Sequence, residues 1–149
     1  MAKGYCVFSN GIYPRLLFVA VGLSEDDANG MFCSERGRLS LDWDGVDAAT
    51  FNEIRERATL DYGSLVVFHS KNEMTPCNMA HEAAHVLDSF MDVLGLERGE
   101  NASNEHLSYL LGWIVKCMDE VKKGHVKPVV PGVKNKKNIN KKERTRNEN

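Results

Sequence analysis

The strongest constraint on the fold is a change in the spacing of apolar residues at Thr75. Before Thr75 the apolar residues form short runs or alternate with polar ones, which is typical of β-strands. Thr75 and Pro76 then form a helix start, with the threonine as N-cap and the proline in the first helical position. Apolar residues follow at helical spacing up to Gly95, and a second apolar stripe predicts another helix over residues 104–122. The sequence therefore predicts an α+β fold, in which a small, mostly antiparallel sheet packs against two main helices.

In the first half of the chain, strands are predicted over residues 3–9, 16–21, 39–43 and 65–69. Residues 16–21 are apolar without interruption, so this strand is expected to be buried on both faces. Residues 22–30 are predicted to form an acidic loop. Residues 50–63 fit either a short helix that begins with a capping box or a hairpin that leads into the next strand. We favour the hairpin.

Charge is divided unevenly along the 149 residues, whose formal net charge is only -2. Residues 122–149 hold ten basic and two acidic residues, a net charge of +8, whereas residues 1–121 hold nine basic and nineteen acidic residues, a net charge of -10. Residues 1–121 have the length of one domain. Residues 122–149 are rich in Lys and Asn, a composition that predicts a disordered basic tail. The apolar share of 42% excludes a wholly disordered chain.

The expected location of the protein is cytoplasmic. The chain starts without a signal-peptide pattern, and none of its apolar runs has the length of a membrane span. Its four cysteines form no Cys-x-x-Cys pair, which indicates reduced thiols.

The motif that carries chemistry is His81-Glu82-Ala83-Ala84-His85, a His-Glu-x-x-His sequence in the first predicted helix. A helical turn takes 3.6 residues, so His81 and His85 project from one face and can bind one zinc ion. Glu82 can then take a proton from a zinc-bound water, because the metal lowers the pKa of that water to near neutrality. The alternative is an exposed helical turn that carries two unrelated histidines.

Two histidines are too few protein ligands for a zinc site, and Glu105 is the best candidate for the third. Glu105 lies at the start of the second predicted helix, which returns antiparallel to the first and can bring this carboxylate back to the histidine pair. Glu100 and His106 are the alternatives. Glu100 lies in a Gly-rich polar loop, and His106 points about 100° away from Glu105 on the helix.

Four further polar residues are candidates for supporting roles. Asp88 follows the second motif histidine by three residues, so it can accept the second ring N–H of a ligand histidine or remain a solvated surface residue. His69, His106 and Tyr109 are candidates for stabilising an oxyanion, although each also suits a structural or merely polar role.

The sequence resembles the zincin metallopeptidases whose third ligand is a glutamate. Residues 81–85 and the downstream Glu105 carry this resemblance, which covers residues 64–118 in the order strand, motif helix, loop and glutamate-bearing helix. Residues 104–111 are similar to the second helix of small zincins associated with phages and mobile elements. The resemblance implies a zincin-like fold in which both motif histidines and Glu105 bind Zn²⁺ and the motif glutamate is the general base. It also implies that residues 65–69 form the edge strand that holds an extended peptide by strand addition.

These features predict a zinc-dependent peptidase, with a protein or peptide as its substrate and no membrane partner. Glu82 would remove a proton from the attacking water and later pass it to the leaving amine. One alternative is a zinc-binding accessory protein of a phage or mobile element that binds a host protein without catalysis. Another is a nucleic-acid-associated protein, because the basic tail suits nucleic acid or an acidic partner.

Overall fold

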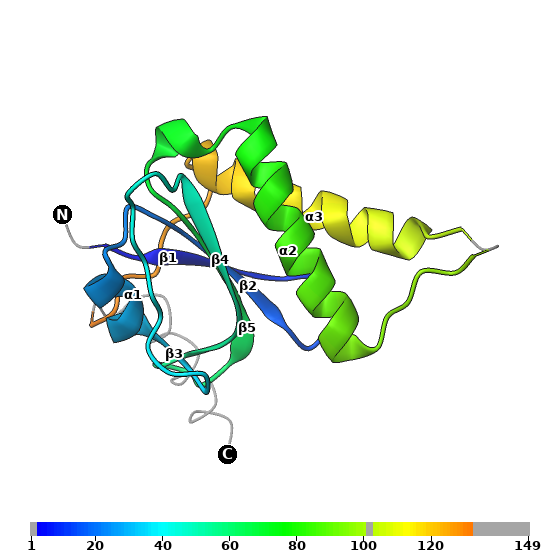
Figure 1. Ribbon diagram of the computed structural model, residues 1–149, viewed down its shortest axis with the longest axis horizontal. Helices are drawn as coiled ribbons and strands as arrows, with labels where there is room; N and C mark the ends of the chain where they lie inside the picture. Colours follow the sequence, from blue (N-terminus) through cyan, green and yellow to red (C-terminus); the bar gives the residue numbers. More distant parts are fainter. Residues whose placement is uncertain (1–2, 101–102, 133–149) are drawn as a thin grey trace, which may run out of the picture.

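The computed structural model describes residues 3–100 and 103–132, which form an α+β domain with a five-stranded mixed sheet (Figure 1). The strand order is β1-β2-β5-β4-β3; β2 and β5 run parallel, and the other three neighbouring pairs are antiparallel. The predicted α+β class and the mostly antiparallel sheet are therefore confirmed. The strands are β1 (Tyr5–Ser9), β2 (Leu16–Val21), β3 (Phe32–Ser34), β4 (Ala48–Glu56) and β5 (Tyr62–Phe68). The helices are α1 (Glu25–Met31), the 3-10 helix η1 (Lys71–Glu73), α2 (Pro76–Leu94) and α3 (Glu105–Lys122).

A different hydrophobic cluster covers each face of the sheet. The helices α2 and α3 pack on one face, and α1 with the segment after β3 packs on the other (Figure 1). Strand β2 contributes to both clusters: Leu17 and Val19 point towards α2 and α3, whereas Phe18 and Ala20 point towards α1. Successive side chains of a strand point to opposite faces, so the uninterrupted apolar run is buried on both sides, as predicted.

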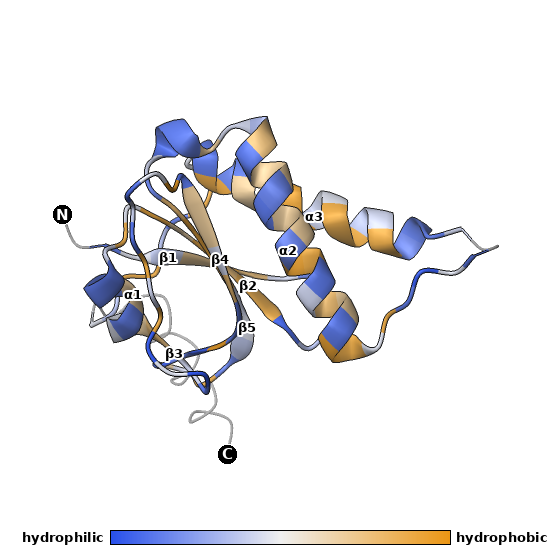
Figure 2. Ribbon diagram, viewed as in Figure 1, coloured by the Kyte–Doolittle hydropathy of each residue, from blue (hydrophilic) through white to orange (hydrophobic). Residues whose placement is uncertain are grey.

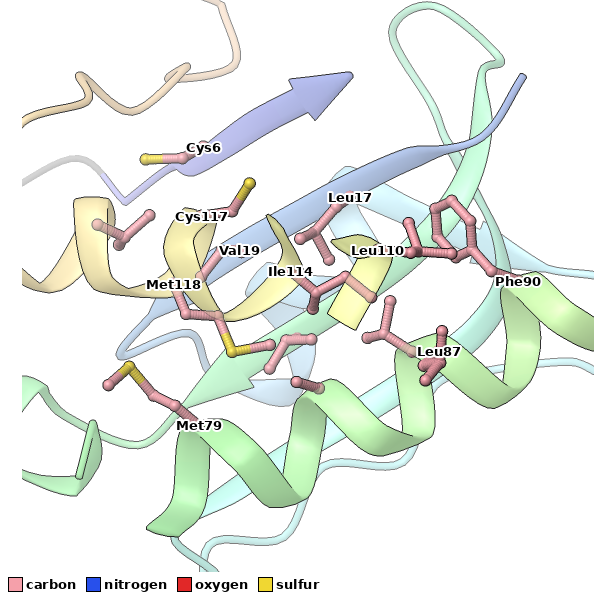
Figure 3. Close-up of a cluster of buried hydrophobic side chains, with 14 of the residues drawn as sticks. Cys6, Leu17, Val19, Met79, Leu87, Phe90, Leu110, Ile114, Cys117 and Met118 are labelled. Atoms are coloured by element: carbon pink, nitrogen blue, oxygen red, sulfur yellow. The ribbon is translucent and has the colours of Figure 1, made fainter. Parts of the chain in front are cut away.

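The two predicted helices are confirmed together with their ends. The Thr75 side chain accepts a hydrogen bond from the backbone N–H of Asn78 at 3.2 Å, and Gly95 ends α2 with a left-handed φ of 65°. Polar and apolar residues occupy different sides of both helices (Figure 2), so each helix buries one face. Side chains such as Leu87 of α2 and Ile114 of α3 meet over β2 (Figure 3).

The predicted acidic loop over residues 22–30 is wrong, because most of it forms α1. Ser24 and Asp27 make a capping box: the Ser24 hydroxyl accepts from the Asp27 N–H at 3.0 Å, and the Asp27 carboxylate accepts from the Ser24 N–H at 2.8 Å. Ala28 is buried on the inner side of α1. The capping box therefore offsets the short length and the weak apolar pattern of this helix.

The predicted strand over residues 39–43 is also wrong. The side chain of Asn29 donates to the Leu39 carbonyl and accepts from the Leu39 N–H, both at 2.8 Å. The indole N–H of Trp43 donates to a backbone carbonyl oxygen at 2.9 Å. Side-chain hydrogen bonds thus satisfy the backbone groups of Leu39 in place of a neighbouring strand. The alternating pattern of the segment is misleading for this reason. Residues 50–63, by contrast, form the favoured hairpin, because β4 pairs antiparallel with β5.

The start of the predicted tail packs against the sheet. After α3 the chain returns to the outer edge of β1, where Tyr5 and Val129 exchange two backbone hydrogen bonds of 3.1 and 2.8 Å. The backbone N–H and C=O groups on this edge of β1 thus provide hydrogen-bond partners for the segment that follows α3. Residues 122–132 thus belong to the folded domain and not to the predicted tail. Residues 133–149 lie outside the described part. Within the described ranges, every helix is too short or too polar to cross a lipid bilayer.

Candidate functional site

Helix α2 presents the imidazoles of His81 and His85 side by side on its exposed face, as the motif predicts. Their Nε2 atoms lie 3.2 Å apart, and the ring planes meet at 75°. Two nitrogens bound to one tetrahedral zinc ion at about 2.0–2.1 Å lie about 3.3–3.4 Å from each other, so the pair fits two positions around such an ion. The same separation suits a hydrogen bond between the rings, which requires one neutral imidazole as acceptor.

Glu82 lies on the neighbouring side of α2, which faces β4, and is only 7% exposed. The Thr50 hydroxyl, in β4, donates a hydrogen bond to Oε2 of Glu82. The Asn52 side chain donates to the backbone carbonyl of His85 at 3.3 Å and accepts from the Ser64 hydroxyl at 2.8 Å. These contacts hold the His-Glu-x-x-His turn against β4.

Strand β4, which packs against α2, has one partly free edge (Figure 1). Strand β5 covers one side of β4, whereas β3 pairs only with residues 54–56 on the other side. In the described part of the chain, the outer side of residues 48–53 therefore has no strand partner. Unpaired N–H and C=O groups on an edge can accept another strand. The expectation that residues 65–69 form this edge is wrong, because β5 lies between β2 and β4.

The free edge ends at an irregularity in the pairing of β4. Glu53 has a φ of 56°, in the left-handed region, and its carboxylate forms an ion pair with Arg36 at 3.0 Å. A cleft of about 450 Å³ lies here between β4 and α2 and is lined by Asp88, Ser89 and Asp92 from the helix. Asp88 thus lies on the histidine side of α2, as predicted, but it is exposed and makes no hydrogen bond to either ring among the described residues.

The structure does not bring the predicted third ligand to the histidine pair. Glu105 is the first residue of α3 and is exposed. Throughout residues 3–100 and 103–132, no group of three His, Cys, Asp or Glu side chains is placed to hold a metal ion. The alternatives Glu100 and His106 are likewise not gathered with the pair. Of the three residues predicted as ligands, the structure therefore brings together only the two histidines.

The predicted oxyanion candidates have other neighbours. His106 and Tyr109 line a pocket of about 420 Å³ beside α3, and Tyr109 is 76% exposed. His69 lies just after β5 and stacks on Trp43, with the ring centroids 5.0 Å apart and an interplanar angle of 12°. Among the described residues, none of the three hydrogen-bonds to the motif.

Thr50 and Asn52 connect β4 to the motif and are absent from the predicted site residues. The run from Thr50 to Glu53 resembles a capping box, and that interpretation hides its role in a strand. The sequence does contain a signal for this role. Thr50 and Asn52 are two positions apart, so in a strand their polar side chains lie on the same face. Polar residues on the face that a helix covers need partners from that helix.

Comparisons with known proteins do not connect the chain to a family. No protein-family model, no curated protein and no solved structure matches it. The site itself is therefore the only basis for a functional conclusion.

Proposed function

We propose that this protein is a zinc-dependent peptidase. His81 and His85 would hold the metal ion, and Glu82 would act as the general base. One observation carries the proposal: the imidazole pair and Glu82 lie on the helix that packs beside the free edge of β4. An imidazole pair with the separation of two zinc ligands, a carboxylate and an unpaired strand edge thus occur together, and this combination supports the proposal.

Bound zinc would supply a positive charge that polarises the scissile carbonyl and lowers the pKa of the attacking water. The unpaired backbone groups of residues 48–53 would bind the substrate as an added strand and orient its peptide bond. Glu82 would remove a proton from the water as the water oxygen bonds to the carbonyl carbon. When the C–N bond breaks, the same carboxyl group would donate that proton to the leaving nitrogen. Thr50 would hold the carboxylate in one orientation through its hydroxyl.

Glu105 is our proposed third ligand. It is the exposed first residue of α3 and is not gathered with the histidine pair in the described part of the chain. To reach the histidine pair, the first turn of α3 has to move from its described position. A water or a substrate oxygen would then occupy the remaining position on the metal.

The first test is the zinc content of the purified, untagged full-length chain, measured by mass spectrometry after reconstitution and removal of excess metal. We expect about one zinc per chain in the wild type, none in His81→Ala and a reduced content in Glu105→Ala. His125→Ala is the matched control, because His125 is an exposed histidine beyond α3 that contacts Glu120 at 3.1 Å. A metal-free wild type after reconstitution would refute the zinc site. Full occupancy in Glu105→Ala would assign the third position to another group.

The second test is cleavage of a library of unstructured peptides by the zinc-loaded wild type and by Glu82→Gln. We expect Glu82→Gln to retain zinc and to lose activity by a factor of about 10² or more, because the amide cannot accept a proton from water. Full activity in zinc-loaded Glu82→Gln would show that Glu82 is not the general base.

A zinc-binding protein without catalysis is the second candidate, and the burial of Glu82 favours it. The carboxylate is 7% exposed and already bonds to Thr50, so a water has limited access to it. In that case, residues 48–53 would bind a strand of a host protein without cleaving it. Retained zinc together with an uncleaved peptide library would support this candidate over the peptidase.

The nucleic-acid alternative depends on the basic tail. Its test is the affinity of the full-length chain for DNA and RNA at several salt concentrations, compared with a chain truncated after Gly132. This truncation keeps the backbone hydrogen bonds of Val129. A salt-dependent affinity that disappears on truncation would support tail-mediated binding, because phosphate contacts release counterions.

A further inference from the structure

A pocket near the end of α2 contains a buried arginine, Arg15, and is called the Arg15 pocket below. Arg15 lies just before β2, is 5% exposed, and lines this cavity of about 520 Å³. Its Nη2 donates a hydrogen bond to the Ser89 hydroxyl at 3.3 Å, and its Cζ lies 5.7 Å from the centre of the Phe90 ring. The guanidinium group is thus held in place by α2.

The charge of Arg15 has no direct counter-ion. In the described part of the chain, no carboxylate oxygen lies within 4.0 Å of its guanidinium nitrogens. Among the described residues, Arg15 Nε is also the only buried side-chain nitrogen or oxygen without a hydrogen-bond partner. Buried polar atoms are nearly always hydrogen-bonded, and a buried charge without a partner is strongly unfavourable. An anion in the pocket would supply the missing partner.

The acidic residues of the pocket have other partners. Glu53 forms its ion pair with Arg36 at 3.0 Å, and Glu35 accepts a hydrogen bond from the Tyr62 hydroxyl at 3.4 Å. Burial lowers the pKa of Arg15, whereas the negative charge of Glu53 raises it. These nearby carboxylates would repel a doubly charged phosphate more than a singly charged carboxylate. A carboxylate also matches the fork of guanidinium N–H groups.

One wall of the Arg15 pocket is apolar. It is formed by Pro14, which precedes β2, and by Val93 and Leu94 at the end of α2, whereas Ser34, Arg36 and Tyr62 add polar groups to the lining. An apolar wall next to a single unpaired cation suits a carboxylate that is attached to an apolar group.

The Arg15 pocket adjoins the proposed peptide-binding edge. Arg36 and Glu53 line both this pocket and the cleft between β4 and α2. Ser89 lines that cleft and accepts the hydrogen bond from Arg15. A peptide added along residues 48–53 would therefore reach the Arg15 pocket where the free edge ends at Glu53.

We propose that the Arg15 pocket binds a carboxylate of a peptide through the Arg15 guanidinium. The assignment of that peptide as a substrate rests on the proposed function, whereas carboxylate binding itself does not. The carboxylate comes either from a free C-terminus or from an Asp or Glu side chain, since both present the same group.

The binding test uses benzoate and its neutral isostere benzamide with the full-length, metal-free chain. Removal of metal with a chelator ensures that the carboxylate cannot coordinate a metal ion at His81 and His85. Calorimetry or NMR titration should show saturable benzoate binding that is at least tenfold tighter than benzamide binding. Equal affinity for the two compounds, or no binding of either, would overturn the proposal without using any variant.

Variants then locate the benzoate site. We expect Arg15→Met to weaken benzoate binding at least tenfold and Arg15→Lys, which keeps the charge but loses the fork, to weaken it less. Arg38→Met is the matched control, because Arg38 is an exposed arginine that pairs with Glu25 and Asp26 away from the pocket. Unchanged affinity in a folded Arg15→Met protein, judged by circular dichroism, would overturn the role of Arg15. Unchanged affinity in Arg15→Lys would overturn binding through the guanidinium fork.

The substrate arm compares matched peptides on the Glu82→Gln protein, which should bind them without turnover. One pair differs only in a free or amidated C-terminus, and a second pair differs only in an internal Glu or Gln. A preference of at least tenfold for the carboxylate within either pair identifies the source of the carboxylate. The preference should be lost when Arg15→Met is added to Glu82→Gln. Equal affinity within both pairs would overturn the assignment to a peptide. Benzoate binding without cleavage of any peptide would contradict the peptidase alone, so the two proposals fail separately.

Discussion

Replacement of Thr50 by valine tests how the structure holds the motif glutamate. Valine keeps the branched shape of threonine but removes the hydroxyl that donates to Glu82. Because Glu82 is 7% exposed, water can replace that donor only in part. A hydrogen bond to a charged group contributes about 1.5–3 kcal/mol, so we expect Thr50→Val to lower the free energy of unfolding by about 2 kcal/mol. For a domain of this size, that loss corresponds to a fall in Tm of about 4–8 °C.

The assay is urea denaturation in the presence of a chelator, because bound metal would add its own stabilisation. The Thr50→Val substitution is measured in the wild type and in Glu82→Met, where the carboxylate is absent. We expect the cost to fall to about 0.5 kcal/mol or less in the second background, which gives a coupling energy of about 1.5 kcal/mol. An equal cost in both backgrounds would refute the hydrogen bond as the source of the effect. A negligible cost in the wild type would show that water satisfies Glu82.

Three further predictions concern the rest of the domain. Gly63→Ala should lower the free energy of unfolding, measured by urea denaturation, by about 3 kcal/mol, because an added Cβ would lie 2.1 Å from a backbone oxygen of β2. An unchanged free energy of unfolding would show that β2 and β5 can move apart to admit the methyl group. Alkylation at pH 8 should modify the exposed Cys77 and spare Cys117 in the native protein, since burial raises the pKa of the Cys117 thiol to about 12; equal rates by mass spectrometry would contradict this. Hydrogen bonds from Ser24 lower the pKa of Asp27 in the folded protein. The stabilisation by this carboxylate should therefore be present above the pKa of about 3.9 that Asp has in the unfolded chain, and it should be lost as the pH falls through the lower pKa of the folded protein. Thermal unfolding at several pH values should show this loss in the wild type and not in Asp27→Asn.

Local spacing accounts for the parts of the candidate site that the sequence predicts. His81 and His85 lie side by side because positions four apart always share a face of an α-helix. The boundaries of α2 were predictable for the same reason, since Thr75 and Gly95 act on the adjacent turns of their own helix. The position of Glu105 was not predictable in this way, because it depends on the loop that joins two helices.

The sequence by itself determined the helices α2 and α3, the buried strand β2, the hairpin of β4 and β5, and the imidazole pair. All of these depend on the period of apolar residues or on capping residues within one element. Only the tertiary structure decided that β4, and not β5, borders the motif with a free edge. It also decided the contacts of Thr50 with Glu82 and of Arg15 with Ser89, which join residues 32 and 74 positions apart. Such pairs form only when the sheet order and the packing of α2 are set, and no local pattern in the chain specifies either of them.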